Sequence, residues 1–266
     1  MNKTGYLLNK LNIRRLLMFY LLGKGFIRAI TTLDMLLGTI LLYGLSFLPS
    51  RFTHRWYPKL FRLWCALFIR ALGVNLKVHQ KNIHTLPKHF MVIGNHPSAF
   101  EDIGLPALFK ARFLGKEEIK DWWILGRIST AANTFYVKRE SKESRAIVRE
   151  AIIKALKKGD NIGLYPEGGC KGRRVFLPFH YGCFDIAIQA NVPIIPVFLH
   201  YEAQEDFEWG AKESLLQKIW TILKTQNKTV NYYIFDAIHP TQFANQASLC
   251  QHVQDLYLKW QIKYLE

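Results

Sequence analysis

The segment Val92–Gly104 reads VIGNHPSAFEDIG, and it follows the apolar residues of a short expected strand. Gly94 and Asn95 lead into His96, and Pro97 suits the first position of a helix. Side chains at strand-to-helix turns tend to point into ligand clefts at the carboxyl edge of a parallel sheet. The segment therefore predicts a strand, a turn that carries His96, and a helix. The alternative is that Asn95 or Ser98 merely caps the helix and His96 is incidental.

Two adjacent acids, Glu101 and Asp102, follow His96 within the same segment. An ideal helix turns about 140° over five residues and about 240° over six, so neither acid shares a helical face with His96. His96 is therefore expected in the turn before the helix, from which its side chain folds back toward an acid. Helical geometry alone leaves Glu101 and Asp102 equal as partners.

Downstream of Val74, expected strands alternate with expected helices. The strands are expected at residues 74–78, 89–93, 135–137, 161–165, 194–198 and 230–234, and the helices at 102–110, 117–128, 142–158, 182–190, 211–225 and 246–264. This alternation predicts an α/β fold with a largely parallel sheet flanked by helices. We expect one catalytic domain over residues 59–266, preceded by a membrane-associated helical segment over residues 1–58.

The N-terminal segment is the most apolar part of the chain. Residues 2–30 mix basic and apolar side chains as an interfacial helix does, and residues 59–73 read as an amphipathic helix. The uncharged run Met35–Leu48 would reach about 21 Å as a helix, which is short of the ~30 Å hydrocarbon core. A helix that dips into one leaflet is therefore favoured over a clean span, and a tilted span stays open.

The overall charge indicates an anionic partner. Lys and Arg outnumber Asp and Glu by 36 to 20, which gives a net charge of +16. Phospholipid headgroups, phosphorylated substrates and nucleic acid all fit this charge, and the aromatic content of 14% does not choose among them. The four cysteines match no zinc-binding spacing and are expected to be reduced thiols.

Two further motifs place cations after expected strands. Residues 164–174, LYPEGGCKGRR, form a glycine-rich cationic turn whose backbone N–H groups suit a phosphate or a developing oxyanion. Residues 135–140, FYVKRE, end a strand in Lys138 and Arg139, and an arginine there can hold phosphate with two parallel hydrogen bonds. A solvated basic loop and a surface ion pair with Glu140 are the alternatives. A fourth block, VPIIPV at 192–197, is expected to be structural.

The order of the four blocks, at 95–101, 135–139, 165–168 and 192–197, resembles the glycerolipid acyltransferase family, whose best-known members are 1-acylglycerol-3-phosphate acyltransferases. Further similarity, including FLGKEEI at 113–119, extends it over roughly residues 60–266. The resemblance implies transfer of an acyl group from coenzyme A or acyl carrier protein to a lysophospholipid hydroxyl at a phospholipid membrane. It implies no metal, no cofactor and no nucleic-acid partner.

The resemblance also implies roles for individual residues. His96 corresponds to the general base, Glu101 takes the position where most members have Asp, and Arg139 corresponds to the binder of the acceptor phosphate. Asp102 remains the second candidate acid. The further candidates for substrate binding are Asn95, Ser98, Lys116, Lys138, Glu167, Gly168, Gly169, Lys171, Arg173 and Arg174. Because the hydroxyl of the acceptor attacks directly, Ser98 and Cys170 are weak candidates for a nucleophile.

One departure from the family pattern leaves the acceptor open. Most members follow Pro-Glu-Gly with Thr-Arg-Ser, whereas this chain has Gly169-Cys170-Lys171. Lysophosphatidic acid is the expected acceptor, and a lyso-ornithine lipid, another lysophospholipid or a lipid A precursor is the alternative. A basic protein that binds membrane or nucleic acid without catalysis is a further alternative. We expect a membrane-associated protein with its active site facing the cytoplasm, on the inner membrane if it is bacterial.

Overall fold

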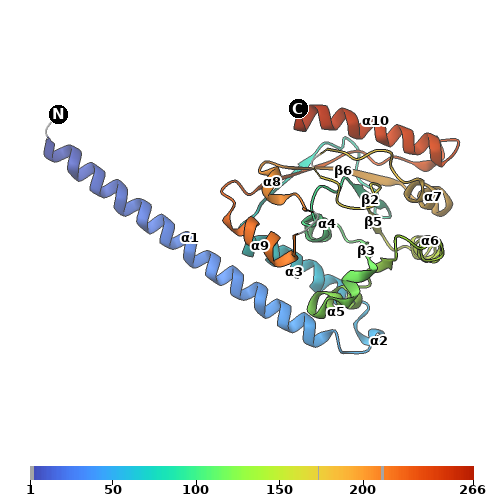
Figure 1. Cartoon of the computed structure of the whole chain (residues 1–266), viewed down its shortest axis with the longest axis horizontal. Coiled ribbons are helices and arrows are strands. Elements are labelled where there is room, and N and C mark those ends of the chain that lie inside the picture. Colours follow the sequence, from blue (N-terminus) through green and yellow to red (C-terminus); the bar gives the residue numbers. More distant parts are fainter. Residues whose placement is uncertain (1–2, 173, 211–212) are drawn as a thin grey trace.

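A seven-stranded sheet forms the centre of the described chain (Figure 1). The computed structural model describes residues 3–172, 174–210 and 213–266, with side chains from residue 18 onward except residues 20 and 21. The strands are β1 (Asn75–Gln80), β2 (Met91–Gly94), β3 (Arg112–Lys116), β4 (Phe135–Val137), β5 (Ile162–Leu164), β6 (Ile194–Tyr201) and β7 (Thr229–Ile234).

The strand order in the sheet is β1-β7-β6-β2-β5-β3-β4. All neighbouring strands pair in parallel except β6 and β7, which are antiparallel. The central strands β2 and β5 are buried along their whole length, as parallel strands covered on both faces are. The expected α/β fold with a largely parallel sheet is confirmed.

Helices cover both faces of this sheet and divide the core into two main clusters. One face packs against α3 (Tyr57–Leu72), α4 (Glu101–Leu108) and α9 (Leu215–Lys224). The other face packs against α6 (Lys142–Lys157), α7 (Tyr181–Ala190) and α10 (Gln246–Leu265). The shorter helices are α2 (Ser50–Thr53), η1 (Glu117–Asp121), α5 (Trp123–Ala131), α8 (Gln204–Phe207) and η2 (Pro240–Gln242).

The N-terminal helix α1 (Lys3–Leu45) runs along the domain at its C-terminal end and extends away from it toward the N-terminus (Figure 1). The Tyr57 hydroxyl donates to the Leu42 carbonyl at 2.8 Å, and the Trp64 indole N–H donates to Thr39 Oγ1 at 2.8 Å. Arg28 Nη2 donates to the last-turn carbonyl of Leu72 in α3 at 3.3 Å. The C-terminal half of α1 is therefore bonded to the folded domain.

The sequence predicts an interfacial helix at residues 2–30 and a second helix, dipping into one leaflet, at residues 35–48. In the structure, one continuous helix, α1, runs through both regions up to Leu45. No proline occurs before Pro49, and no glycine interrupts residues 26–37. Nothing in the connecting residues breaks a helix, which explains the continuity. The expected domain boundary after residue 58 falls within the first turn of α3, whose helix begins at Tyr57.

The other expected strands and helices are present, although their ends differ by a few residues. Two larger differences concern β3 and the expected helix at residues 117–128. Strand β3 was not expected, because RFLGK holds two cations and a glycine and buries only Phe113. The expected helix at 117–128 is instead η1 followed by α5. The expected helix at 211–225 begins at Leu215, and residues 211 and 212 lie outside the described residues.

Candidate active site

The neighbouring strands β2 and β5 bring the histidine motif and the Pro-Glu-Gly motif together. Ile93 pairs in register with Leu164, so both motifs leave the sheet at the same edge. The backbone N–H of His96 donates to Glu167 Oε1 at 3.2 Å, and the N–H of Lys171 donates to the His96 carbonyl at 3.3 Å. Glu167 is buried and therefore positions the backbone of His96 from the adjacent motif.

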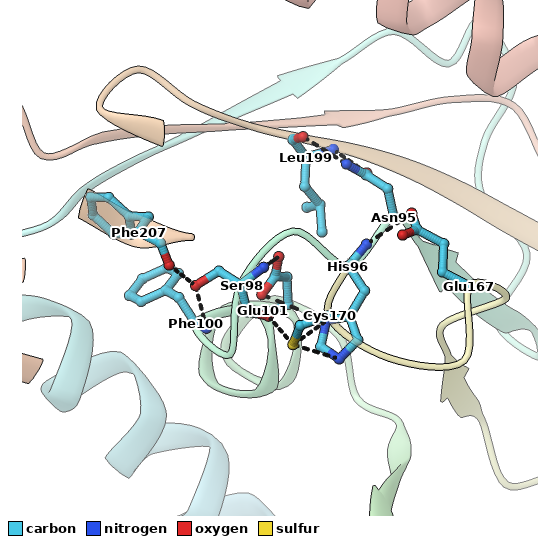
Figure 2. Close-up of polar contacts among 9 residues, drawn as sticks. All are labelled: Asn95, His96, Ser98, Phe100, Glu101, Glu167, Cys170, Leu199 and Phe207. Carbon is cyan, nitrogen blue, oxygen red and sulfur yellow. Dashed lines mark hydrogen bonds and ion pairs between the residues drawn. The ribbon is translucent and has the colours of Figure 1, made fainter. Parts of the chain in front are cut away.

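The His96 ring is held on both faces, by Tyr165 and by Cys170, the latter drawn in Figure 2. The Tyr165 ring stacks on one face, with 4.0 Å between centroids and 8° between planes. Cys170 Sγ lies 3.4 Å from Nε2 and 3.8 Å from Nδ1, distances that place the sulfur over the ring and not in line with either lone pair. Because Tyr165 occupies one face, the sulfur lies on the other. The Cys170 thiol donates to the Ser98 carbonyl at 3.2 Å, which anchors it there.

Glu101 is the acid that lies closest to the imidazole. Its Oε2 is 3.8 Å from His96 Nδ1, which is too long for a hydrogen bond, and its Oε1 accepts from the Ser98 backbone N–H at 2.8 Å. The bond from Ser98 ties the turn that carries His96 to Glu101, the first residue of α4. The two interpretations of this segment are thus compatible, because Glu101 both begins α4 and faces His96 (Figure 2).

Burial shifts the pKa values of all three groups toward their neutral forms. Burial lowers the pKa of His96 to about 4; the charge of Asp102 opposes this and that of Arg139 adds to it. Burial raises the pKa of Glu101 well above its usual range, against the backbone N–H groups of Glu101 and Ser98 and the Tyr201 hydroxyl. Burial also raises the pKa of Asp102, against the charge of His96. The imidazole is therefore neutral near pH 7, which is the form that accepts a proton.

This lowered pKa predicts an unusual pH profile for acyl transfer. A base with a pKa of about 4 stays unprotonated throughout pH 5–8, so kcat/KM should lack the fall below pH ~6.5 that an ordinary histidine causes. The measurement is kcat/KM of the free enzyme between pH 5 and pH 8, at constant ionic strength and with its folded state checked at each pH. A fall in kcat/KM centred near pH 6.5 would contradict the assignment.

A cavity of about 640 Å³ opens on His96 from between β4, α6 and α7, and we call it the acceptor cavity. Its apolar lining includes Leu114, Val137, Val148, Ile152, Leu164 and Ile186. Its cations are Arg139, Lys142, Arg145 and Arg149, and no carboxylate is among its described lining residues. The cavity therefore combines apolar and cationic side chains next to His96.

Glycines shape the wall of the acceptor cavity nearest His96. Gly168 has a φ of +75°, and a Cβ there would lie 2.6 Å from the His180 ring. A Cβ on Gly169 would lie 2.8 Å from Arg139 Nη1. Arg145 donates to the Arg139 carbonyl, so α6 supports the strand end that carries Arg139. The glycine at position 169 thus allows the Arg139 guanidinium to pack over the backbone of the motif.

Several residues expected to bind substrate hold the fold instead. The side-chain amide of Asn95 makes two hydrogen bonds to the backbone of Leu199. Its Oδ1 accepts from the Leu199 N–H at 2.7 Å, and its Nδ2 donates to the Leu199 carbonyl at 2.9 Å. Ser98 Oγ donates to the Phe207 carbonyl at 2.5 Å and accepts from the Phe100 N–H at 3.1 Å (Figure 2). Both side chains are buried, and their bonds connect the turn to β6 and α8.

The cations expected to bind substrate have different surroundings in the structure. Arg139 lines the acceptor cavity, whereas Lys116 pairs with Glu118 at 2.7 Å and Lys171 lies 5.0 Å from the Phe176 ring centroid. Lys138 is exposed after β4. Arg174 pairs with Glu266 at 3.1 Å, on the last residue of the chain, and is 72% exposed. Arg173 lies outside the described residues.

Sequence reasoning missed the residues that surround the imidazole. Tyr165 and Cys170 belong to the motif it singled out, but no spacing rule indicates that they clamp His96. His180, Arg145 and Arg149 line the acceptor cavity from segments that it treated only as helix or as linking sequence. A basic helix directly after the strand that carries Arg139 was the one available signal for Arg145 and Arg149.

Known proteins share part of the sequence of this chain. A family model described as Acyltransferase matches residues 75–200. The chain carries an acyltransferase domain. The resemblance inferred from the four ordered blocks is thereby confirmed, and the matched region of this acyltransferase contains His96, Glu101, Arg139 and Glu167.

Curated relatives of this acyltransferase carry two kinds of name. A 1-acyl-sn-glycerol-3-phosphate acyltransferase of Neisseria gonorrhoeae is 30% identical over 136 residues, which cover 50% of this chain and 52% of that protein. The alignment thus spans about half the length of that relative. A lyso-ornithine lipid O-acyltransferase of Pseudomonas aeruginosa is 27% identical over 203 residues, which cover 74% of this chain and 76% of that protein.

A solved structure supports the fold. The crystal structure of the 1-acyl-sn-glycerophosphate acyltransferase of Thermotoga maritima superposes with a TM-score of 0.53 and covers 87% of this chain and 95% of that chain. Its sequence identity is 18%, so this likeness concerns the arrangement of the strands and helices alone.

Proposed function

We propose that this acyltransferase moves an acyl group from a coenzyme A or acyl carrier protein thioester to the free hydroxyl of lysophosphatidic acid, giving phosphatidic acid. The observation that carries the proposal is a neutral, buried imidazole that lines a cavity of apolar and cationic side chains. A lipid hydroxyl is a weak nucleophile and needs a base at the moment of attack. His96 supplies that base.

In the proposed reaction, the acceptor hydroxyl enters the acceptor cavity and loses its proton to His96 as its oxygen attacks the thioester carbonyl. The C–S bond then breaks, and the leaving thiolate takes the proton back from His96. The imidazolium formed in between is stabilised by an acid at Nδ1, which is the place of Glu101. Tyr165 and Cys170 keep the ring plane constant through both proton transfers.

The charge of the acceptor cavity supports a phosphate-bearing acceptor. Arg139 lies over the backbone of Gly169, and Lys142, Arg145 and Arg149 line the same cavity. These cations compensate for the arginine that most family members carry after Pro-Glu-Gly and that is Cys170 here. Arg149 is paired with Asp185 at 3.3 Å, so Arg139, Lys142 and Arg145 are the cations that suit a phosphate better than an ornithine headgroup, which carries an ammonium itself. The lyso-ornithine lipid is the second candidate, because the relative of that name aligns over more of the chain.

An acceptor panel tests the proposed function. Purified full-length protein in phospholipid-detergent micelles would be given one acyl-coenzyme A and, separately, lysophosphatidic acid, lyso-ornithine lipid, a lysophospholipid with a headgroup and a lipid A precursor. We expect the highest kcat/KM with lysophosphatidic acid. Turnover of lyso-ornithine lipid without turnover of lysophosphatidic acid would replace the first candidate by the second.

Membrane association is the other part of the proposal. Leu22–Leu45 of α1 is long and apolar enough to cross a membrane by length and composition, and only 6% of its most apolar window is buried. Its outward side exposes Phe26, Leu33, Leu37 and Ile40. Because Arg28, Thr39 and Leu42 are bonded to the domain, we infer that α1 lies in one leaflet with the domain beside it. A cytoplasmic orientation belongs to the same proposal.

A further inference from the structure

A second cavity is lined by Asp102, the second candidate acid. Its volume is about 500 Å³, and residues of α3, α4, β3 and α5 line it. Asp102 lines this cavity, whereas His96 lines the acceptor cavity, and Leu114 lines both. His96 and Asp102 thus line different cavities, and Leu114 is a lining residue that the two cavities share.

The second cavity is strongly cationic. Its lining cations are Arg55, Lys59, Arg62, Lys88, Lys110 and Arg112. Its two lining carboxylates are Asp102 and Asp160, so six Lys and Arg side chains line the cavity beside two carboxylates. Asp160 is already neutralised by Arg112, whose Nη1 lies 2.9 Å from its Oδ2. An anion that enters this cavity meets a positive potential along its length.

Four of these cations have no internal partner. Within the ranges that the structure describes, the side chains of Arg55, Lys59, Lys88 and Lys110 make no ion pair or hydrogen bond. They come from the loop before α3, α3 itself, the segment before β2 and the end of α4. Cations that converge from four separate segments repel one another, and a bound polyanion removes that repulsion.

We propose that the second cavity binds the nucleotide half of an acyl-coenzyme A donor and directs the pantetheine thioester past Leu114 toward His96. The proposal rests on the proposed function, which requires a thioester donor. A nucleotide with several phosphates matches the charge, and the volume is in the range of small-molecule sites. The acceptor hydroxyl needs direct access to His96 and therefore takes the acceptor cavity, which leaves the second cavity to the donor.

Reversing two of these charges tests the assignment. Lys88 and Lys110 are exposed and belong to segments outside α1, so the double variant Lys88→Glu/Lys110→Glu leaves the sequence of the lipid-facing helix unchanged. We expect its KM for acyl-coenzyme A to rise about tenfold or more, since one lost charge-assisted hydrogen bond is enough for that change. We expect kcat and the KM for lysophosphatidic acid to stay within about twofold, because neither residue lines the acceptor cavity. The matched control is Lys81→Glu/Lys259→Glu, which makes the same change in charge at two exposed lysines that line neither cavity.

Direct binding separates this proposal from the proposed function. Free coenzyme A and 3′,5′-adenosine diphosphate, titrated calorimetrically into full-length protein, should bind to the wild type and to the control, and at least tenfold more weakly to the Lys88→Glu/Lys110→Glu variant. A rise in KM for lysophosphatidic acid alone, an effect restricted to acyl carrier protein donors, or equal binding by all three proteins would overturn the donor site. If the wild type binds coenzyme A but transfers no acyl group, the donor site stands and the proposed function fails.

Discussion

Replacing His96 by alanine should lower kcat for acyl transfer by roughly 10²–10⁴-fold, the usual contribution of a positioned general base. The side chain is 4% exposed, opens on the acceptor cavity and is clamped between Tyr165 and Cys170. Its low pKa keeps the ring ready to accept a proton near pH 7. The measurement is the initial rate with saturating acyl-coenzyme A and lysophosphatidic acid.

Two controls make this result interpretable. Alanine leaves a gap between Tyr165 and Cys170 and is expected to destabilise the fold, so thermal unfolding must accompany the kinetics. His96→Asn fills more of the gap without supplying the base and should lose activity to a similar extent. His239→Ala removes an exposed histidine that lines neither cavity and should retain the wild-type rate. Wild-type turnover by His96→Ala would exclude the mechanism.

Glu101→Gln should cost more activity than Asp102→Asn. We expect a loss in kcat of about 10²-fold or more for Glu101→Gln, by analogy with the orienting acid of hydrolase triads, and less than about tenfold for Asp102→Asn. Glu101 lies 3.8 Å from Nδ1, and glutamine preserves the acceptor for the Ser98 N–H, so only the ionisable group is removed. The measurement is kcat of each variant beside its melting temperature.

The pH dependence of kcat in the same variants distinguishes the effect of contact with His96, made by Glu101, from the effect of a charge at a distance, carried by Asp102. Burial raises the pKa of Glu101 well above its usual range, and burial lowers the pKa of His96, which the charge of Asp102 partly opposes. If Glu101 acts as a carboxylate, the kcat of the wild type should rise with pH as Glu101 loses its proton, and Glu101→Gln should abolish this rise. A larger loss in Asp102→Asn would show that charge at a distance outweighs contact and that Asp102 is the partner.

Sequence reasoning predicted the layered α/β fold because strand and helix periodicities are local properties. The alternation of apolar runs with helical segments after Val74 was enough to predict a largely parallel sheet. It could not predict that β7 runs antiparallel to β6, since strand direction depends on the connection through α9. It missed β3, which is stabilised by pairing with β4 and β5 and not by its own RFLGK sequence.

At the candidate active site too, the sequence determined some features of the histidine segment and the tertiary structure decided the others. By itself the sequence determined that His96 precedes a helix beginning near two acids, and the ordered blocks identified the family, because motifs and their order are written along the chain. Only the tertiary structure decided that Glu101 Oε2 faces Nδ1, that Tyr165 and Cys170 clamp the ring, and that Asp102 faces a second cavity. These contacts join residues from adjacent strand ends, and their distances depend on strand order and on burial, which no spacing along the sequence contains.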